Sequence, residues 1–146
     1  MLTPTKKLFH AMEAVVYIAC HQANAPVSSK EIAEIQELPP RYLEQMLQKL
    51  VRADILRGVR GPRGGYLLAR ERRRISLRDI YQVIEDEQVT ADITEQSEIS
   101  KTLNNVWQAL QEESLAALEK VTLAELCDSV SNSEEKKKSK IADFTI

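Results

Sequence analysis

Apolar residues recur at helical spacing through the first fifty positions of the chain, and the recurrence divides into three segments. Positions three or four apart between residues 4 and 21 predict a first helix with one buried face. These positions are Leu8, Met12, Val15, Val16 and Ala19. The run Asn24-Ala25-Pro26 is typical of a helix end, so a second segment is expected to start after it.

Two further helices are predicted beyond this break, separated by a tight connection. Ser28 and Glu31 have the spacing of a capping box, which favours the start of a short helix. Pro39-Pro40 favours the start of a longer one, because proline lacks only an amide hydrogen that the first turn leaves unpaired. The apolar positions are Ile32, Ala33 and Ile35 in the short helix and Tyr42, Leu43, Met46, Leu47, Leu50 and Val51 in the longer one. A short helix, a turn and a longer helix are the plan of a helix-turn-helix.

All glycines of the chain lie immediately after the third predicted helix. They are Gly58, Gly61, Gly64 and Gly65. The turn dipeptides 61–62 and 64–65 lie between the apolar runs 55–56 and 66–68, and this pattern predicts a β-hairpin. Arg60 and Arg63 lie near its tip, as in a wing that contacts a phosphate backbone or a minor groove. An ordinary surface turn is the alternative for this loop taken alone.

The second half of the chain has a different pattern. Residues 70–74 are predicted to be a charged linker, and Ser76 with Asp79 forms another capping box that starts a fourth helix. The longest predicted helix runs from about residue 98 to 120 and carries a heptad-like apolar seam. The seam consists of Ile99, Leu103, Val106, Leu110, Ala117 and Val121. Such a seam outside the helix-turn-helix is typical of a dimerisation helix, and packing on the first helix of the same chain is the alternative.

These patterns predict a mostly α-helical fold with one small β-hairpin. Residues 1–85 are expected to form a winged helix-turn-helix DNA-binding domain, and residues 86–97 an acidic loop. Residues 98–130 are expected to hold the dimerisation helix and a short C-terminal helix, followed by a charged, frayed tail at 131–146. A chain of 146 residues is long enough for one such domain and an added arm.

The charges are segregated along the chain, although the net charge is only −2. Residues 41–78 hold eleven Lys and Arg against three acids, a local charge of +8. Residues 79–135 hold two basic residues against fourteen acids, a local charge of −12. A basic block beside an acidic block indicates a surface that binds a polyanion. An ordinary solvated surface would explain the high charge but not the separation of the two signs along the chain.

The second helix of a helix-turn-helix enters the major groove with its first turns. Here those turns present Arg41, Tyr42, Glu44 and Gln45. Glu44 suits a hydrogen bond from cytosine N4, because a carboxylate facing phosphate would be repelled, and Gln45 suits adenine or a phosphate. Tyr42 also fits the apolar spacing, so a place at the edge of the core is equally consistent. Further predicted contacts are Lys49 and Arg52 with the backbone and Arg60 or Arg63 with a narrow minor groove. Ser28 and Ser29 could contact phosphate, although capping is favoured for these serines.

Other chemistry finds little support in the sequence. Cys20 and Cys127 lie far apart and form no metal or redox motif, which fits a reduced cytoplasmic protein. His10 and Glu13 lie one turn apart, but a metal site with Cys20 or His21 would need a second subunit, so no metal is predicted. The first helix is too polar for a secretion signal, and no segment is apolar enough to span a bilayer. Because a nucleophile–base pair and a phosphate-binding loop are both missing, an enzyme is not expected.

Two motifs carry a resemblance to a known family. The run Tyr42-Leu43-Glu44-Gln45 and residues 59–68, Val-Arg-Gly-Pro-Arg-Gly-Gly-Tyr-Leu-Leu, resemble the Rrf-type bacterial regulators, the family of IscR, NsrR and CymR. The similarity runs from Leu2 to about Val130. It implies a homodimeric winged-helix transcription factor, bound to an imperfect palindrome, whose long helix crosses its partner. By position it implies that Tyr42, Glu44 and Gln45 belong to the recognition helix and that Arg60 enters the minor groove.

The chain departs from many relatives in one respect. The resemblance implies an iron–sulfur cluster held by three closely spaced cysteines before the long helix, but residues 85–102 contain neither Cys nor His. Since such a cluster prefers thiolates, we predict no cluster and no other cofactor. Family members without a cluster sense through a partner protein or a reactive thiol. Cys127 is the candidate redox thiol, with a small buried side chain as the alternative.

The sequence therefore predicts a homodimeric, sequence-specific DNA-binding regulator, acting as a repressor in the cytoplasm at the nucleoid. Its expected partners are double-stranded DNA, a second copy of the chain and a regulatory protein. The alternative function is that of a scaffold or protein-interaction dimer whose DNA binding is weak or controlled by a partner.

Overall fold

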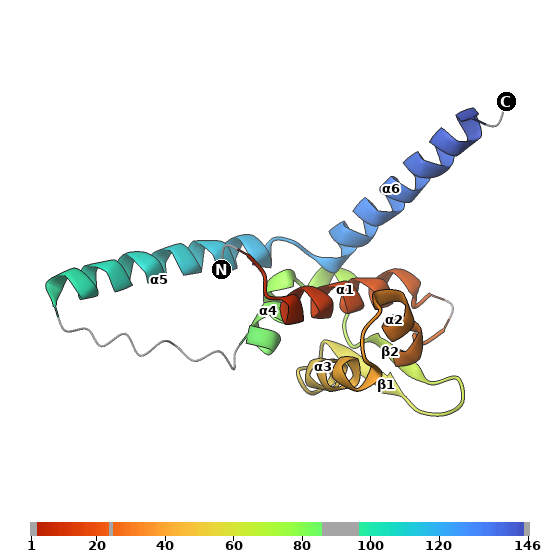
Figure 1. The fold of residues 1–146 in the computed structure, drawn as a ribbon, viewed down its shortest axis with the longest axis horizontal. Helices are drawn as coiled ribbons and strands as arrows, with labels where there is room; N and C mark the ends of the chain where they lie inside the picture. Colours follow the sequence, from red (N-terminus) through yellow and green to blue (C-terminus); the bar gives the residue numbers. More distant parts are fainter. Residues whose placement is uncertain (1–2, 24, 86–96, 145–146) are drawn as a thin grey trace.

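The computed structural model describes residues 3–23, 25–85 and 97–144. The elements are α1 (Lys6–His21), α2 (Ser29–Gln36), α3 (Pro40–Arg52), β1 (Leu56–Val59), β2 (Gly65–Leu68), η1 (Arg72–Arg74), α4 (Leu77–Glu85), α5 (Glu98–Glu119) and α6 (Leu123–Phe144). Residues 5–85 form a compact head, from which α5 and α6 extend as two arms in different directions (Figure 1). The predicted fold class, mostly helical with one hairpin, is confirmed.

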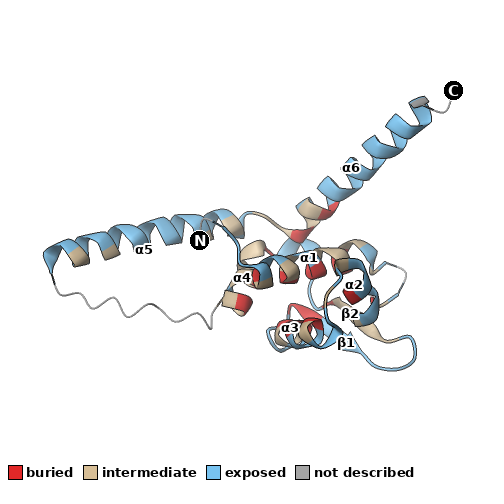
Figure 2. Ribbon diagram, in the orientation of Figure 1, coloured by how far each residue is buried: buried red, intermediate tan, exposed pale blue. Residues whose placement is uncertain are grey.

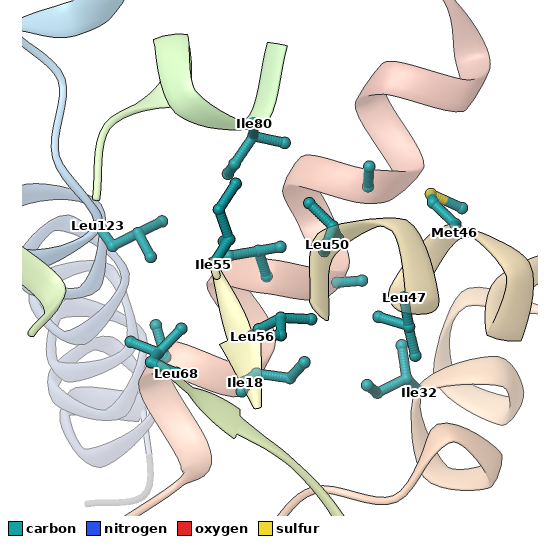
Figure 3. Packing of buried hydrophobic residues seen from close by; sticks show 14 of the residues in the cluster. Ile18, Ile32, Met46, Leu47, Leu50, Ile55, Leu56, Leu68, Ile80 and Leu123 are labelled. Atoms are coloured by element: carbon teal, nitrogen blue, oxygen red, sulfur yellow. The ribbon is translucent and has the colours of Figure 1, made fainter. Parts of the chain in front are cut away.

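One apolar core holds the head together. Ile18 of α1, Ile32 of α2, Leu47 of α3 and Leu56 of β1 all belong to this core (Figure 3). Each such side chain, when fully buried, contributes about 1.5–3 kcal/mol to folding. The largest fully buried side chains are Val15, Ile18, Ile32, Leu43, Leu47, Leu50, Ile55, Leu56, Ile75, Ile80 and Leu123. Leu123 belongs to α6, so the first turn of this arm is anchored in the core of the head.

The predicted capping boxes set the starts of two helices. At α4 the box is complete, because Ser76 N donates to Asp79 Oδ2 (2.9 Å) and Asp79 N donates to Ser76 Oγ (3.3 Å). At α2 the Ser28 hydroxyl accepts from Glu31 N (3.2 Å). The Glu31 carboxylate accepts instead from the Tyr17 hydroxyl (3.2 Å), so this box has one of its two bonds and ties α2 to α1.

The hairpin is linked to the segment that precedes α2. β1 and β2 pair in antiparallel register, with Leu56 opposite Leu68 and Val59 opposite Gly65. Val27 then pairs with Tyr66 through two backbone hydrogen bonds of 3.0 and 2.8 Å. A Cβ on Gly65 would collide with the Val27 carbonyl, so this close approach requires glycine. The pairing places the start of α2 beside the hairpin.

Two local expectations were wrong, and the predicted charged linker contains a short turn. Residues 72–74 of this linker form a 3-10 helix. Ile35 was expected on the buried face of the second helix but is 55% exposed, because that helix has only two turns and buries Ile32 and Ala33. The short C-terminal helix and frayed tail are one helix through residue 144. Residues 123–144 contain no Gly or Pro, and Glu precedes Lys at helical spacing there, which favours continuation of the helix.

The long helix α5 buries none of its residues within the chain. It contacts α4, where Arg78 pairs with Glu119 at 3.1 Å, and most of its length is exposed (Figure 2). The alternative that its seam packs on the first helix of the same chain is therefore wrong. Val121, predicted as the last seam position, lies beyond the end of α5 in the connection to α6.

This connection is fastened to the head by backbone hydrogen bonds. Leu77 N donates to Val121 O (2.9 Å), and Leu123 N donates to Ile75 O (2.9 Å). Glu125 N donates to the Thr122 hydroxyl (3.3 Å), which caps the start of α6. The two arms thus leave the head from one fixed junction.

Candidate nucleic-acid interface

The third helix presents a continuous polar face to solvent. Because α3 buries Leu43, Met46, Leu47 and Leu50 on one side, the polar residues between them point outward. A shallow hollow on this outward side is lined by Arg41, Glu44, Gln45, Gln48, Lys49 and Arg52. The structure thus gathers five of the residues predicted as DNA contacts on one surface and adds Gln48.

A second hollow lies between the start of α2, α3 and the hairpin. Its lining is Ser28, Ser29, Gln48, Gly58, Val59, Arg60, Gly61, Gly64, Gly65 and Tyr66. Gln48 borders both hollows, which join into one surface that we call the α3–wing face. Gln48 was not among the predicted contacts, although it follows Arg41 and Gln45 at helical spacing on the polar side of α3.

Tyr42 lies at the edge of the core, as the alternative for this residue stated. It is half-buried, and its ring meets the His10 ring edge-on, with centroids 6.0 Å apart and an interplanar angle of 89°. The Tyr42 hydroxyl and His10 Nδ1 are 3.5 Å apart. These contacts orient the first turn of α3 against α1.

The tip of the hairpin depends on its glycines. Gly61 has a φ of +113°, a conformation that L side chains rarely adopt, and its carbonyl accepts from Gly64 N (2.9 Å). A Cβ on Gly64 would collide with the Val59 carbonyl. Arg60 and Arg63 are exposed on the loop, which projects beyond the head (Figure 1). The tight turn therefore carries two cationic side chains away from the body of the protein.

Among the ten arginines of residues 41–78, one group of three forms ion pairs, and a second group of four was predicted to contact DNA. Arg70, Arg73 and Arg78 form ion pairs with acids of the head or of α5, at N–O distances of 3.9, 2.7 and 3.1 Å. Within the part of the chain that the structure describes, no ion pair engages the second group, Arg41, Arg52, Arg60 and Arg63. Arg41, Arg52 and Arg60 therefore leave positive charge on the α3–wing face for an anionic ligand, and Arg63 adds charge at the exposed hairpin loop beside this face.

Glu44 is the acidic residue of the α3–wing face. Burial raises the pKa of Tyr66 above its usual value, and the nearby Glu44 carboxylate raises it further. The Glu44 carboxylate, which lines the first hollow, is therefore near Tyr66 of the hairpin, which lines the second hollow. An exposed carboxylate among guanidinium groups accepts hydrogen bonds, which suits an amino group on a base edge better than a phosphate.

The two serines are placed at the wing side of this face. Ser28 is the N-cap of α2, as favoured from the sequence, and Ser29 is the first residue of that helix. Both are half-buried and both line the second hollow.

The two cysteines, which form no motif in the sequence, are neighbours in the structure. Cys20 Sγ of α1 and Cys127 Sγ of α6 lie 3.0 Å apart, across 107 residues of chain. Cys127 is buried and Cys20 is half-buried. Burial raises the pKa of Cys20 to about 12, and the hydrogen bond to Cys127 acts in the same direction.

The histidines of α1 are engaged with aromatic side chains. His10 meets Tyr42, and His21 stacks on Tyr17 with centroids 4.1 Å apart. Across the described residues, no three His, Cys, Asp or Glu side chains lie close enough together to hold a metal ion. Among the same residues, no helix combines the length and the apolar character of a membrane span.

An exposed cationic helix face, set beside a β-hairpin that carries arginines, is the architecture of a winged helix-turn-helix DNA-binding protein. The profile of the Rrf2 family, described as "Iron-dependent Transcriptional regulator", matches residues 5–129. The chain belongs to this family and is a DNA-binding transcriptional regulator. The resemblance drawn from residues 42–45 and 59–68 is thereby confirmed.

Individual relatives agree with this assignment. An HTH-type transcriptional regulator of Synechocystis is 36% identical over 84% of this chain and 85% of its own length. IscR of Sodalis glossinidius is 35% identical over 89% of this chain and 79% of its own length. These relatives are transcriptional regulators, in agreement with the expectation that the chain is not an enzyme.

Solved structures show the same fold. CymR of B. subtilis, described as its global cysteine regulator, superposes with a TM-score of 0.74 at 28% identity over 88% of this chain and 98% of its own. IscR of T. potens has a TM-score of 0.74 at 32% identity, over 90% of each chain.

The donor atoms of this chain do not match a cysteine-held iron–sulfur cluster. Such clusters are held by four ligands, most of them Cys, whereas this chain has two cysteines in all. Their sulfur atoms contact each other at the junction of α1 and α6, away from the segment between α4 and α5. That segment, residues 86–97, contains neither Cys nor His, and most of it lies outside the described residues.

Proposed function

We propose that the protein is a homodimeric repressor that binds an imperfect palindrome through two α3–wing faces. The observation that carries this proposal is the combination of a cationic face on the head with an uncovered apolar face on α5. Two heads joined through their arms would meet two half-sites, and the symmetry of the dimer would match that of the DNA.

The apolar face of α5 supports the dimer. Ile99, Leu103, Val106 and Leu110 are between 50% and 75% exposed, and Trp107, which the predicted seam omitted, is 51% exposed. Ala117 is also exposed. Soluble monomers rarely expose so many large apolar side chains along one helix, so a second α5 is the natural cover. Trp107 sits between the seam positions and widens the face beyond a strict heptad stripe.

The α3–wing face supports two kinds of DNA contact. Glu44, Gln45 and Gln48 project from α3 as groups that read base edges in a major groove. Arg41, Lys49 and Arg52 neighbour them and suit phosphates, which set the register without specifying sequence. Arg60 and Arg63 suit the narrow minor groove of an A·T-rich flank.

No cofactor is part of this proposal. The two cysteines and the composition of residues 85–102 support a regulator without an iron–sulfur cluster. We propose that it acts in the cytoplasm at the nucleoid, and that its signal reaches it through a regulatory protein or through thiol chemistry.

Binding to the regulator's own promoter tests the proposal. Fluorescence anisotropy of the full chain is measured with a duplex carrying the promoter and with a duplex of the same composition in shuffled order. We expect at least about a thousandfold preference for the promoter and a steep loss of affinity with salt. Equal affinity for the two duplexes contradicts sequence-specific binding.

Transcription from that promoter in vitro tests the sign of regulation. A repressor lowers the amount of transcript as the promoter becomes occupied. A rise in transcript would show an activator instead, and a scaffold dimer would leave the transcript unchanged at every concentration.

A further inference from the structure

We propose that Cys20 and Cys127 are a modification site that forms a reversible disulfide between the head and the α6 arm. The proposal does not depend on DNA binding. It starts from the junction of the two regions, where the C-terminal turn of α1 meets the first turns of α6.

The geometry brings the two sulfur atoms within reach of a bond. Their separation is 3.0 Å, against about 2.05 Å in a disulfide, so a movement of about 1 Å suffices. Contacts of Leu123 with the core hold the backbone near Cys127 in place. Leu123, one turn before Cys127, is fully buried in the core, and its N–H donates to Ile75 O. The backbone around the pair is therefore fixed in the reduced protein.

The two thiols differ in access. Cys127 is 3% exposed and lies within the apolar core, whereas Cys20 is half-buried at its edge. Arg72 of η1 is the cation that acts on Cys20, and Glu134 of α6 acts on it in the opposite direction. An oxidant thus meets Cys20 first, and Cys127 is the resolving thiol. This order differs from the sequence prediction, in which Cys127 was the candidate redox thiol; the burial of Cys127 agrees with the alternative stated there, a small buried side chain.

The oxidant that fits is a low-molecular-weight disulfide. The Cys20 thiolate attacks one sulfur of the reagent, its S–S bond breaks, and the first thiolate leaves with a mixed disulfide on Cys20. Cys127 then loses its proton and attacks Cys20 Sγ, expelling the second thiolate. The protein loses two electrons and two protons, and the reagent becomes two thiols. Because the Cys20 thiol has a raised pKa, the first step is slow at neutral pH.

The bond would lock the existing arrangement rather than switch it. Both thiols are already in contact in the folded chain, so oxidation requires no new packing. It closes a loop across 107 residues and joins the ends of a long chain segment, which restricts the unfolded chain strongly. Neither cysteine lines the α3–wing face, so we expect DNA affinity to change by less than about threefold.

The test uses the full chain and 2-hydroxyethyl disulfide as the oxidant. The folded protein is incubated with the reagent at mildly alkaline pH, and it is then unfolded in denaturant that contains excess iodoacetamide, so that every remaining thiol is alkylated. We expect a monomeric chain lighter by two hydrogens, without added alkyl groups, and a peptide pair that links residues 20 and 127. We also expect a melting temperature higher by more than about 5 °C, reversed by dithiothreitol.

Two variants are the matched controls. Cys20→Ser and Cys127→Ala each retain one thiol, and each should show no oxidant-dependent rise in melting temperature. Melting in reductant establishes that both variants are folded before the comparison is made. The proposal is overturned if the folded wild-type chain keeps two alkylatable thiols, if it stops at a stable mixed disulfide, or if the bond joins two chains.

Discussion

The helices α3 and α5 carry similar apolar stripes but have opposite fates in the folded chain. Leu43, Leu47 and Leu50 of α3 are fully buried, whereas Leu103 and Leu110 of α5 are at least 50% exposed. The difference lies in their surroundings. α3 packs against α2, β1 and α4, whereas among the described residues the main contact of α5 with the head is with α4. The head therefore completes its core within one chain, whereas the apolar face of α5 stays uncovered in that chain, which supports the proposed dimer.

The largest expected effect is a cavity in the head. Leu50→Ala removes a fully buried side chain from the centre of the core, so we expect a loss of about 2–5 kcal/mol in the free energy of unfolding. Chemical denaturation measures it. Leu103→Ala is the comparison in the arm, and in dilute, monomeric protein it should cost little. Equal losses in the two variants would show that the arm packs within its own chain.

The next effect concerns association of the arms. Leu103→Asp places a charge in the exposed apolar face of α5, and we expect the dimer dissociation constant to rise more than about a hundredfold. Gln108→Asp adds the same charge on the opposite side of the helix and is the control. Sedimentation velocity compares the two variants. The proposed interface is wrong if they dissociate equally, or if neither differs from the wild type.

Smaller effects are expected within the α3–wing face. Glu44→Ala should change the preferred base at one position by about 1–3 kcal/mol, while non-specific binding stays equal or becomes stronger, because a negative charge is removed. Arg60→Ala should weaken binding broadly, most at A·T-rich flanks, and lower the salt slope.

Anisotropy titrations over a panel of duplexes and salt concentrations separate the two DNA-binding effects. Gln48→Ala belongs in the same series, and we expect it to behave as Glu44→Ala does, with a change in base preference. Identical losses for Glu44→Ala and Arg60→Ala on every duplex would contradict the separate roles assigned to helix and wing.

The smallest expected effect is the change in Cys20 reactivity with each pH unit, at the junction of head and arm. The pKa of Cys20 is raised to about 12, so the reactive thiolate is a minor species throughout the neutral range. As long as the pH is below this pKa, the thiolate population rises about tenfold with each unit by which the pH increases. Alkylation of Cys20 by iodoacetamide, followed by mass spectrometry between pH 7 and 10, should show this increase. A plateau near pH 8 would indicate an ordinary, solvated thiol.

The sequence predicted those features that depend on neighbouring residues. The boundaries of α3, the boxes at Ser28 and Ser76 and the turn at Gly61 follow from local hydrogen bonding and backbone freedom. The grouping of Arg41, Glu44 and Gln45 on one face follows from helical period alone. These features needed no knowledge of the tertiary fold.

Features that depend on distant residues were missed. The contact between Cys20 and Cys127 joins positions 107 residues apart, and no spacing rule indicates it. Helical spacing could have placed Gln48 on the polar side of α3, but its position beside the hairpin depends on the tertiary fold. Trp107 lies beside the heptad seam, so the 3.5-residue repeat that defines the seam does not include it. The length of α6 was missed because a charged composition resembles that of a frayed tail.

The stoichiometry of the complex with promoter DNA tests the central claim most directly. Sedimentation equilibrium of the full chain with a duplex carrying both half-sites should give two chains per duplex, and the Leu103→Asp variant should lose this complex while its head stays folded. A tight complex of one chain with one duplex, unchanged in Leu103→Asp, would contradict the account in which two chains associate through their arms and each head binds one half-site.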